Sequence, residues 1–172
     1  MSDNQLPLRI AQTLGITTSA VVAGFVSSAS FALVPRMLES PTPLLLKQWG
    51  NAYAAGKKNV PPFAALSSAC YFYLAYTLPS DAQKAKLYGY LAAGALTIGI
   101  IPYTLLVMLP TNKKLLEKVD ETKALTVKDE VVEVGLGNET AHKLVDSWGM
   151  LNLGRAVLLT AGSLVGAWTA LN

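Results

Sequence analysis

The chain has 172 residues, of which 52% are hydrophobic and only 15% are charged. That charged fraction is well below the roughly 25% of ordinary soluble domains, which points to a membrane protein the size of one domain. The net charge of +3 is modest, and the basic residues stand in short clusters beside apolar runs, so we expect no nucleic-acid partner.

The sequence contains one cysteine, Cys70, and one histidine, His142. A single cysteine excludes a disulfide framework within the chain and a metal site built from several cysteines. A single histidine excludes a histidine-rich metal centre within one chain. We therefore expect no bound metal, and any catalysis can use at most one imidazole.

Four stretches are long and apolar enough to cross a membrane, which takes roughly 20 helical residues for about 30 Å of hydrocarbon. None alternates steadily between apolar and polar residues, and each exceeds the length of an ordinary strand, so helices are favoured. The sequence therefore predicts an all-α fold: a four-helix transmembrane bundle forming one integral membrane domain over residues 1–172. The predicted spans run from about Leu8 to Val34, Pro62 to Leu78, Leu87 to Leu109 and Trp148 to Leu171.

The first span could instead act as a secretory signal, because it is N-terminal and has small residues around Ser28-Ala-Ser30. Its apolar run of about 25 residues is longer than a typical signal core, so we expect an uncleaved anchor.

Two larger loops are predicted on one side of the bundle, Pro35 to Pro61 and Pro110 to Ser147. They hold four and six basic residues, whereas the opposite side holds three, and the positive-inside rule then places both loops in the cytoplasm. Asn138-Glu-Thr140 matches the N-glycosylation pattern, which would require a lumenal loop. The alternative is that Asn138 caps a short helix from Glu139 to Asp146.

Two features predict how the spans pack. Pro102 lies midway along the third span and should kink it, freeing a carbonyl near Ile98 and opening space in the bundle. Gly162-x-x-x-Gly166 on the last span allows close helix approach. We expect that contact within the chain, and a homo-oligomer contact is the less favoured use.

Arg155 is the most informative polar residue, because a charge within a span is costly and tends to face the bundle interior. At 100° per helical residue, Trp148, Asn152 and Arg155 share one face of the last span. The alternatives are that Arg155 extends to the membrane interface and that Asn152 only joins two helices.

Further candidates lie around these spans. His142 precedes the last span with Asp146 at i+4, an arrangement that suits a general base with a fixed tautomer but also a solvated loop histidine. Trp49 and Tyr53 stand one helical turn apart in the first larger loop. If this segment is helical, it could form an aromatic lid on the membrane, or it could be an ordinary interfacial helix. Tyr103 would need a hydrogen-bond partner if buried.

Together these residues resemble a known pattern. Trp49-x3-Tyr53-x2-Gly56, Pro102-Tyr-Thr with Met108-x-Pro-Thr-Asn112, and His142-x5-Trp148-x3-Asn152-x2-Arg155 are similar to the anthrone oxygenase-like family of small four-span membrane proteins. The resemblance covers nearly the whole chain. It implies a membrane-bound monooxygenase that oxidises an anthrone-type polyketide to an anthraquinone with molecular oxygen and no other cofactor.

The resemblance also implies a place and roles for the candidates. An endomembrane location, such as the endoplasmic reticulum, is expected. His142 would act as base oriented by Asp146, while Arg155 and Asn152 stabilise an enolate or phenolate oxygen. Aromatic side chains would bind a flat tricyclic substrate. The expected catalytic residues are His142, Asp146, Asn152 and Arg155, and the expected substrate-binding residues are Trp49, Tyr53, Tyr103, Asn112 and Trp148.

The alternative is a non-enzymatic membrane scaffold or assembly protein whose polar residues only join the helices. It predicts a close-packed interior with Arg155 satisfied by an acid or by carbonyls, although all aspartates and glutamates lie outside the spans. The enzyme predicts a cavity beside Arg155 wide enough for a tricyclic ring. A transporter or channel subunit is not indicated, because the sequence has no internal repeat.

Overall fold

The computed structural model describes residues 5–78, 84–122 and 140–172, and these are helical almost throughout. The first helical stretch comprises α1 (Leu6–Ser28), the π-helical segment η2 (Ala29–Leu33) and α2 (Val34–Leu38). The second is α3 (Thr42–Tyr76). The third comprises α4 (Lys84–Ile98), α5 (Ile100–Tyr103), the π-helical segment η3 (Thr104–Met108) and α6 (Leu109–Thr122). The last is α7 (Ala141–Leu171).

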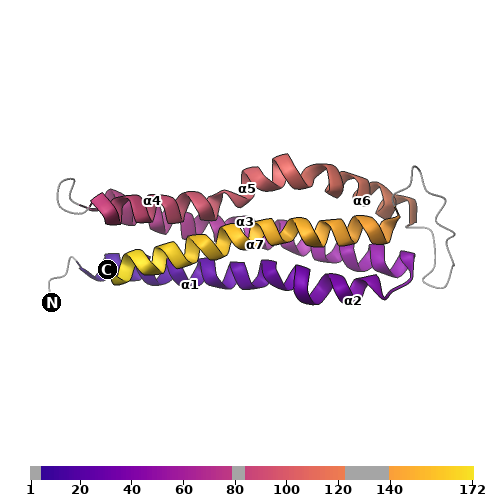
Figure 1. Ribbon diagram of the computed structural model, residues 1–172, viewed down its shortest axis with the longest axis horizontal. Coiled ribbons are helices and arrows are strands. Elements are labelled where there is room, and N and C mark those ends of the chain that lie inside the picture. Colours follow the sequence, from indigo (N-terminus) through magenta and orange to yellow (C-terminus); the bar gives the residue numbers. More distant parts are fainter. Residues whose placement is uncertain (1–4, 79–83, 123–139) are drawn as a thin grey trace.

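The four stretches lie side by side as an antiparallel bundle, with the start of α1 and the end of α7 at the same end (Figure 1). The helices α1 and α4 lie at opposite corners, and each packs against both α3 and α7. Consecutive stretches are therefore neighbours, as short connections between antiparallel helices require. The predicted all-α four-helix bundle is confirmed in the described part of the chain.

Helices continue through much of the two regions predicted as larger loops. Only residues 39–41 separate α2 from α3, and α6 extends to Thr122. The cause is packing, because Leu45 and Trp49 of α3 are buried in one core cluster with Leu115 of α6 and Val145 of α7. Hydropathy marks where an apolar stretch stops, and these helices continue beyond that point. At about 1.5 Å per residue, the 35 residues of α3 span roughly 52 Å.

The start of α7 also differs from the prediction. Thr140 is its N-cap, and the Thr140 hydroxyl oxygen accepts a hydrogen bond from the Lys143 backbone N–H at 3.2 Å. The predicted short helix ending at Asp146 and the predicted last span are one continuous helix of 31 residues. Asn138, with its glycosylation pattern, lies outside the described residues.

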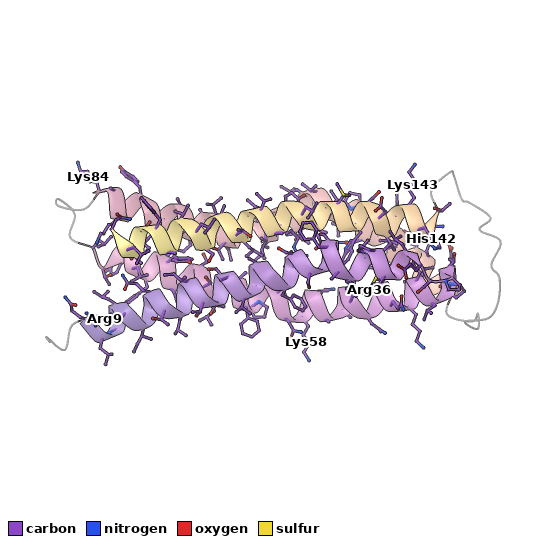
Figure 2. All side chains as sticks on the ribbon, turned by 60° about the horizontal axis from the view of Figure 1, so that its bottom comes forward. Arg9, Arg36, Lys58, Lys84, His142 and Lys143 are labelled. Atoms are coloured by element: carbon purple, nitrogen blue, oxygen red, sulfur yellow. The ribbon has the colours of Figure 1, made fainter. Side chains whose placement is uncertain are left out.

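The surface of the bundle changes along its length. Three stretches are long and apolar enough to cross a membrane, Leu6–Leu38, Lys84–Thr122 and Ala141–Leu171. Large apolar side chains stay exposed in the half that holds the start of α1, among them Val21 and Trp168. Arg36, Lys58 and Lys143 project from the other half, whereas Arg9 and Lys84 lie at the far end (Figure 2).

Small residues allow the helices to approach closely in the apolar half. A Cβ added to Gly162 would collide with Thr97, and one added to Gly166 would collide with the ring of Tyr71. The Tyr71 hydroxyl also lies 2.9 Å from Oγ of Ser19 on α1. The two glycines are thus used for contacts within the chain, as predicted.

Pro102 distorts the third stretch, as predicted. It lacks an N–H and cannot donate to the carbonyl of Ile98, where α4 ends. The chain then bends through α5 and η3 before α6 begins (Figure 1). A second π-helical segment, η2, interrupts the first stretch. Such π-helical turns are rare and often accompany functional sites.

Candidate functional site

A cavity of about 420 Å³ lies between the four stretches, beside both π-helical segments. Its volume falls within the roughly 300–1,000 Å³ of small-molecule sites. Val26, Ile100 and Met108 are typical of its mainly apolar wall. The polar residues lining it come from all four stretches and are Ser28, Tyr53, Lys57, Thr104, Asn112, Trp148, Asn152 and Arg155.

The predicted face of α7 forms one wall of this cavity. Trp148, Asn152 and Arg155 all line it, which their spacing of one helical turn predicted. The Asn152 side-chain amide donates to the Trp148 carbonyl at 2.8 Å, and its Oδ1 accepts from Nη1 of Arg155 at 3.2 Å. Asn152 is therefore fixed to its own helix and orients the guanidinium.

Two buried polar atoms at the cavity lack a partner. Within the described residues, neither Nε of Arg155 nor Oδ1 of Asn112 makes a hydrogen bond. A buried unsatisfied group costs about 1–3 kcal/mol, which binding of a complementary ligand would recover. The donor of Arg155 suits a ligand oxygen that carries negative charge, and the acceptor of Asn112 suits a ligand hydroxyl. Asn112 thus lines the cavity as predicted.

The charges lining the cavity have one sign. Lys57 and Arg155 are its cationic residues, and the described residues that line it include no aspartate or glutamate. Nor do the described residues contain a group of three or more His, Cys, Asp or Glu side chains that could hold a metal ion. The site is therefore suited to an anionic or polarised oxygen.

Aromatic residues form part of the cavity wall. Tyr53 and Trp148 line it, while Trp49 lies behind them, fully buried. The ring of Trp49 stacks on Tyr53 with centroids 5.0 Å apart and meets Trp148 edge-on at 6.0 Å. The predicted lid or interfacial helix on the membrane is wrong, because these residues belong to α3 and pack inside the bundle. Trp49 supports the lining aromatics from behind.

Tyr103 is half-buried and does not line the cavity. Its hydroxyl donates to the Leu151 carbonyl of α7 at 3.1 Å, which gives the enclosed phenol the partner it needs. The ring passes directly over Gly154, where a Cβ would collide with it. Tyr103 therefore holds α5 against α7 next to Arg155, and it lies outside the lining in which its predicted role in substrate binding would place it.

His142 and Asp146 are not at the cavity, which corrects the predicted grouping with Arg155. From residue 142 to residue 155 the rise along α7 is roughly 20 Å at about 1.5 Å per residue. Nε2 of His142 lies 3.1 Å from the Ser40 carbonyl oxygen, and Asp146 is exposed. A rigid helix keeps His142 away from Arg155, so we do not retain His142 as the base or Asp146 as its orienting acid.

Several lining residues were not predicted. Phe25 and Val26 come from α1 and Ile100 from α5, and no local pattern marks them, because they meet only through tertiary packing. Gly56 and Lys57 had a signal, since Gly56 closes the aromatic motif on α3 and Lys57 follows it. A Cβ on Gly56 would meet nothing within 4 Å, so this glycine leaves part of the cavity open.

The fold and the cavity define the class of protein, a four-helix bundle with an interior small-molecule site in which a half-buried cation faces apolar and aromatic walls. Comparison with known proteins then names the family. Residues 49–165 match the family described as Anthrone oxygenase. The chain belongs to the anthrone oxygenase family, as its motifs predicted.

Individual relatives agree over most of their length. Anthrone oxygenase encC of Aspergillus fumigatus is 31% identical over 94% of this chain and 93% of its own. Anthrone oxygenase AgnL2 of Paecilomyces divaricatus is 31% identical over 91% and 93%. Noranthrone monooxygenase of Aspergillus flavus is 26% identical over 89% and 70%. No solved structure matches the chain.

Proposed function

We propose that this protein is a membrane-bound monooxygenase that oxidises an anthrone-type polyketide to an anthraquinone with molecular oxygen. The observation that carries the proposal is Arg155, a cation with no acid beside it among the described residues that line an apolar cavity, in a chain of the anthrone oxygenase family. The relatives named anthrone oxygenase and noranthrone monooxygenase supply the substrate class.

The reaction can proceed without a resident cofactor, because the substrate supplies the electrons. The central methylene of an anthrone is acidified by the ketone opposite it, and loss of one proton gives an enolate. The enolate passes electrons to oxygen, a bond forms between the methylene carbon and one oxygen atom, and protonation gives a hydroperoxide. The hydroperoxide then loses water, as its C–H and O–O bonds break and the second carbonyl forms. One oxygen atom enters the quinone and the other leaves as water.

The lining residues suit this sequence of steps. Arg155 stabilises the negative charge that develops on the ketone oxygen, in a mainly apolar site. Asn152 holds the guanidinium in place. Tyr53 and Trp148 bind the flat rings, and Asn112 accepts a hydrogen bond from a ring hydroxyl. We assign no side chain as the base, and the methylene proton passes to water.

The same proposal places the bundle in a membrane as one integral domain, with its apolar half in the hydrocarbon. Three long apolar stretches support this. An endomembrane such as the endoplasmic reticulum is the proposed compartment. The cavity then lies where exposed apolar residues give way to basic ones, and a lipophilic aromatic substrate can reach it from the bilayer.

Replacing Arg155 tests the proposal directly. The purified parent protein in detergent should consume oxygen with an anthrone and form the anthraquinone, measured with an oxygen electrode and by absorbance. In Arg155→Ala the rate should fall by about 10²–10³-fold, the usual effect of losing one donor to a developing oxyanion. Arg36→Ala, at an exposed cation outside the cavity, is the matched control and should keep the parent rate.

Two results would contradict the proposal. One is that the parent protein does not accelerate anthrone oxidation above its rate in buffer alone. The other is an Arg155→Ala variant that folds, with an unchanged melting temperature, and is as fast as the parent. The scaffold alternative predicts the second result. The cavity itself, whose described lining residues include no acid, argues against that alternative.

A further inference from the structure

A second hollow, of about 400 Å³, lies between α1 and α3 on the outside of the bundle. Its wall comes from residues 17–25 of α1 and residues 59–63 of α3, and we call it the α1–α3 groove. Phe25 and Val60 line both this groove and the cavity. The two spaces are therefore neighbours that share part of their walls.

The groove and the cavity follow one another along the seam between α1 and α3. On the first stretch, the groove ends at Phe25, and the cavity is lined from Phe25 onward to Leu33. On α3, which runs in the opposite direction, the groove is lined by residues 59–63 and the cavity by residues 52–61. Both helices give the same order, so the groove extends from the cavity toward the apolar half of the bundle.

The groove is apolar and uncharged, unlike the cavity. Val21 and Phe63 line it, and each exposes more than half of its surface. The described residues that line the groove include no lysine, arginine, aspartate or glutamate. The hydroxyl of Thr17 donates to the Thr13 carbonyl of its own helix at 2.6 Å. The groove therefore suits an uncharged apolar molecule, whereas Arg155 in the cavity suits an anion.

Both helices depart from regular hydrogen bonding where the groove meets the cavity. On α3, Pro61 and Pro62 lie inside the helix and cannot donate to the carbonyls four residues earlier. On the first stretch, α1 gives way to η2 at Ala29, one helical turn beyond Phe25. Helices bend at such interruptions, so the two walls of the seam can separate most easily at this level.

We propose that the α1–α3 groove is the site at which an uncharged anthrone enters from the bilayer, and that the ring of Phe25 is the threshold between this site and the cavity. This inference rests on the proposed function and adds the route of the substrate to it. Phe25 is 52% exposed, whereas Val60 is 3% exposed, so Phe25 is the shared side chain that has room to move. The substrate loses its proton only after it has passed Phe25 and meets Arg155.

A removable plug in the groove tests the inference. In a Cys70→Ala background, Phe63→Cys places a single thiol in the groove. Benzyl methanethiosulfonate adds an aromatic ring to this thiol through a mixed disulfide, and methyl methanethiosulfonate adds only a methyl group. Dithiothreitol removes both groups, so each protein serves as its own reference.

Binding of anthraquinone to the protein in lipid nanodiscs is the measurement. Quenching of tryptophan fluorescence reports the rates of binding and release, because Trp148 lines the cavity. All variants also carry Trp168→Phe, since Trp168 is 71% exposed and would be quenched by anthraquinone dissolved in the lipid. The anthraquinone does not react further, so this readout is independent of catalysis.

The benzyl group should slow both binding and release by about 10-fold and leave the Kd within about twofold, because an obstructed route slows both directions alike. The methyl group should change neither rate, and dithiothreitol should restore the rates of the benzylated protein. Unchanged rates with the benzyl group would overturn the inference. That result is expected if the groove holds a lipid chain instead of the substrate.

Leu164→Cys is the matched control. Leu164 of α7 is 65% exposed and lines neither the groove nor the cavity. It lies at about the same depth as Phe63, because α3 and α7 run in the same direction and Trp49 meets Trp148 about four helical turns earlier. A benzyl group at Leu164→Cys should leave both rates unchanged. Equal slowing at the two positions would overturn the inference.

Phe25→Ala tests the threshold itself. Removing the ring should raise the rates of binding and release together, because the passage widens. A rise in the release rate alone would overturn the role of Phe25 as a threshold, since it would mean that the ring is only a wall of the cavity.

Oxidation of anthrone by the same proteins keeps the two proposals distinguishable. A parent that binds anthraquinone at rates that the plug slows, but that does not accelerate anthrone oxidation, overturns only the proposed reaction. A parent that oxidises anthrone, and whose binding rates the benzyl group leaves unchanged, overturns only the inference on the groove.

Discussion

At the scale of single residues, the site depends on how Asn152 and Arg155 share one hydrogen bond. The Asn152 side chain uses its amide N–H on its own helix and its oxygen on the guanidinium. Nε of Arg155 then remains without a partner among the described residues. The guanidinium is thus oriented without being neutralised, which keeps its charge available for a substrate oxygen.

The variant Asn152→Asp separates two effects on Arg155, the orientation of its guanidinium and the availability of its charge. The aspartate can still accept from Arg155, but it supplies an anion that competes with the substrate enolate. We expect the rate of anthrone oxidation to fall further than in Asn152→Ala, while the melting temperature rises above that of Asn152→Ala because Arg155 gains a counter-charge. Oxygen uptake and thermal unfolding measure the two quantities. An Asn152→Asp variant faster than Asn152→Ala would show that the free charge of Arg155 is not needed.

These residues also show what local sequence can predict. The shared face of Trp148, Asn152 and Arg155 was predicted because helical geometry fixes positions separated by one turn. His142 was grouped with Arg155 through the family resemblance, although the helix holds His142 roughly 20 Å from Arg155. A role that came from the family resemblance alone had no geometric support.

At the scale of helices, the cavity exists because two stretches depart from regular geometry beside it. The segments η2 and η3 are both π-helical, and residues of each line the cavity. Pro102 predicted the irregularity of the third stretch, because proline has no backbone N–H and cannot donate a hydrogen bond. The segment η2 lies just before Pro35, which likewise cannot donate to the carbonyl of Phe31, so the sequence held a signal of this irregularity that the prediction did not use. The wall contributed by α1 was not predicted, because its residues meet the other helices only through tertiary packing.

Filling the cavity from α3 tests whether its volume is needed. A Cβ at Gly56 meets nothing within 4 Å, so Gly56→Leu should place its side chain in the open space without disturbing the fold. We expect the KM for an anthrone to rise by about 10-fold or more, with little change in melting temperature. Gly24→Leu is the matched control, because a Cβ there also meets nothing within 4 Å and Gly24 does not line the cavity. Equal kinetics of the two variants would place the substrate elsewhere.

At the scale of the whole molecule, the bundle is longer than a bilayer is thick. Its apolar half was predicted from hydropathy, because a long, outward-facing apolar surface leaves a continuous apolar signal in the sequence. Its other half was predicted as loops, because its outer surface is basic and polar while its inner face is a buried core that includes Leu45 and Val145. This half is helical because the apolar faces of its amphipathic helices pack against one another. The proposed site lies at the junction of the two halves.

Thiol labelling tests which half faces the cytoplasm. In a Cys70→Ala background, Lys47→Cys and Lys84→Cys each introduce one exposed thiol, at opposite ends of the bundle. The basic half is proposed to be cytoplasmic by the positive-inside rule, so an impermeant maleimide added to sealed microsomes should label Lys47→Cys at once. Lys84→Cys should react only after detergent opens the vesicles. The reverse pattern would invert the topology, and labelling of both thiols in sealed vesicles would mean that the bundle does not cross the membrane.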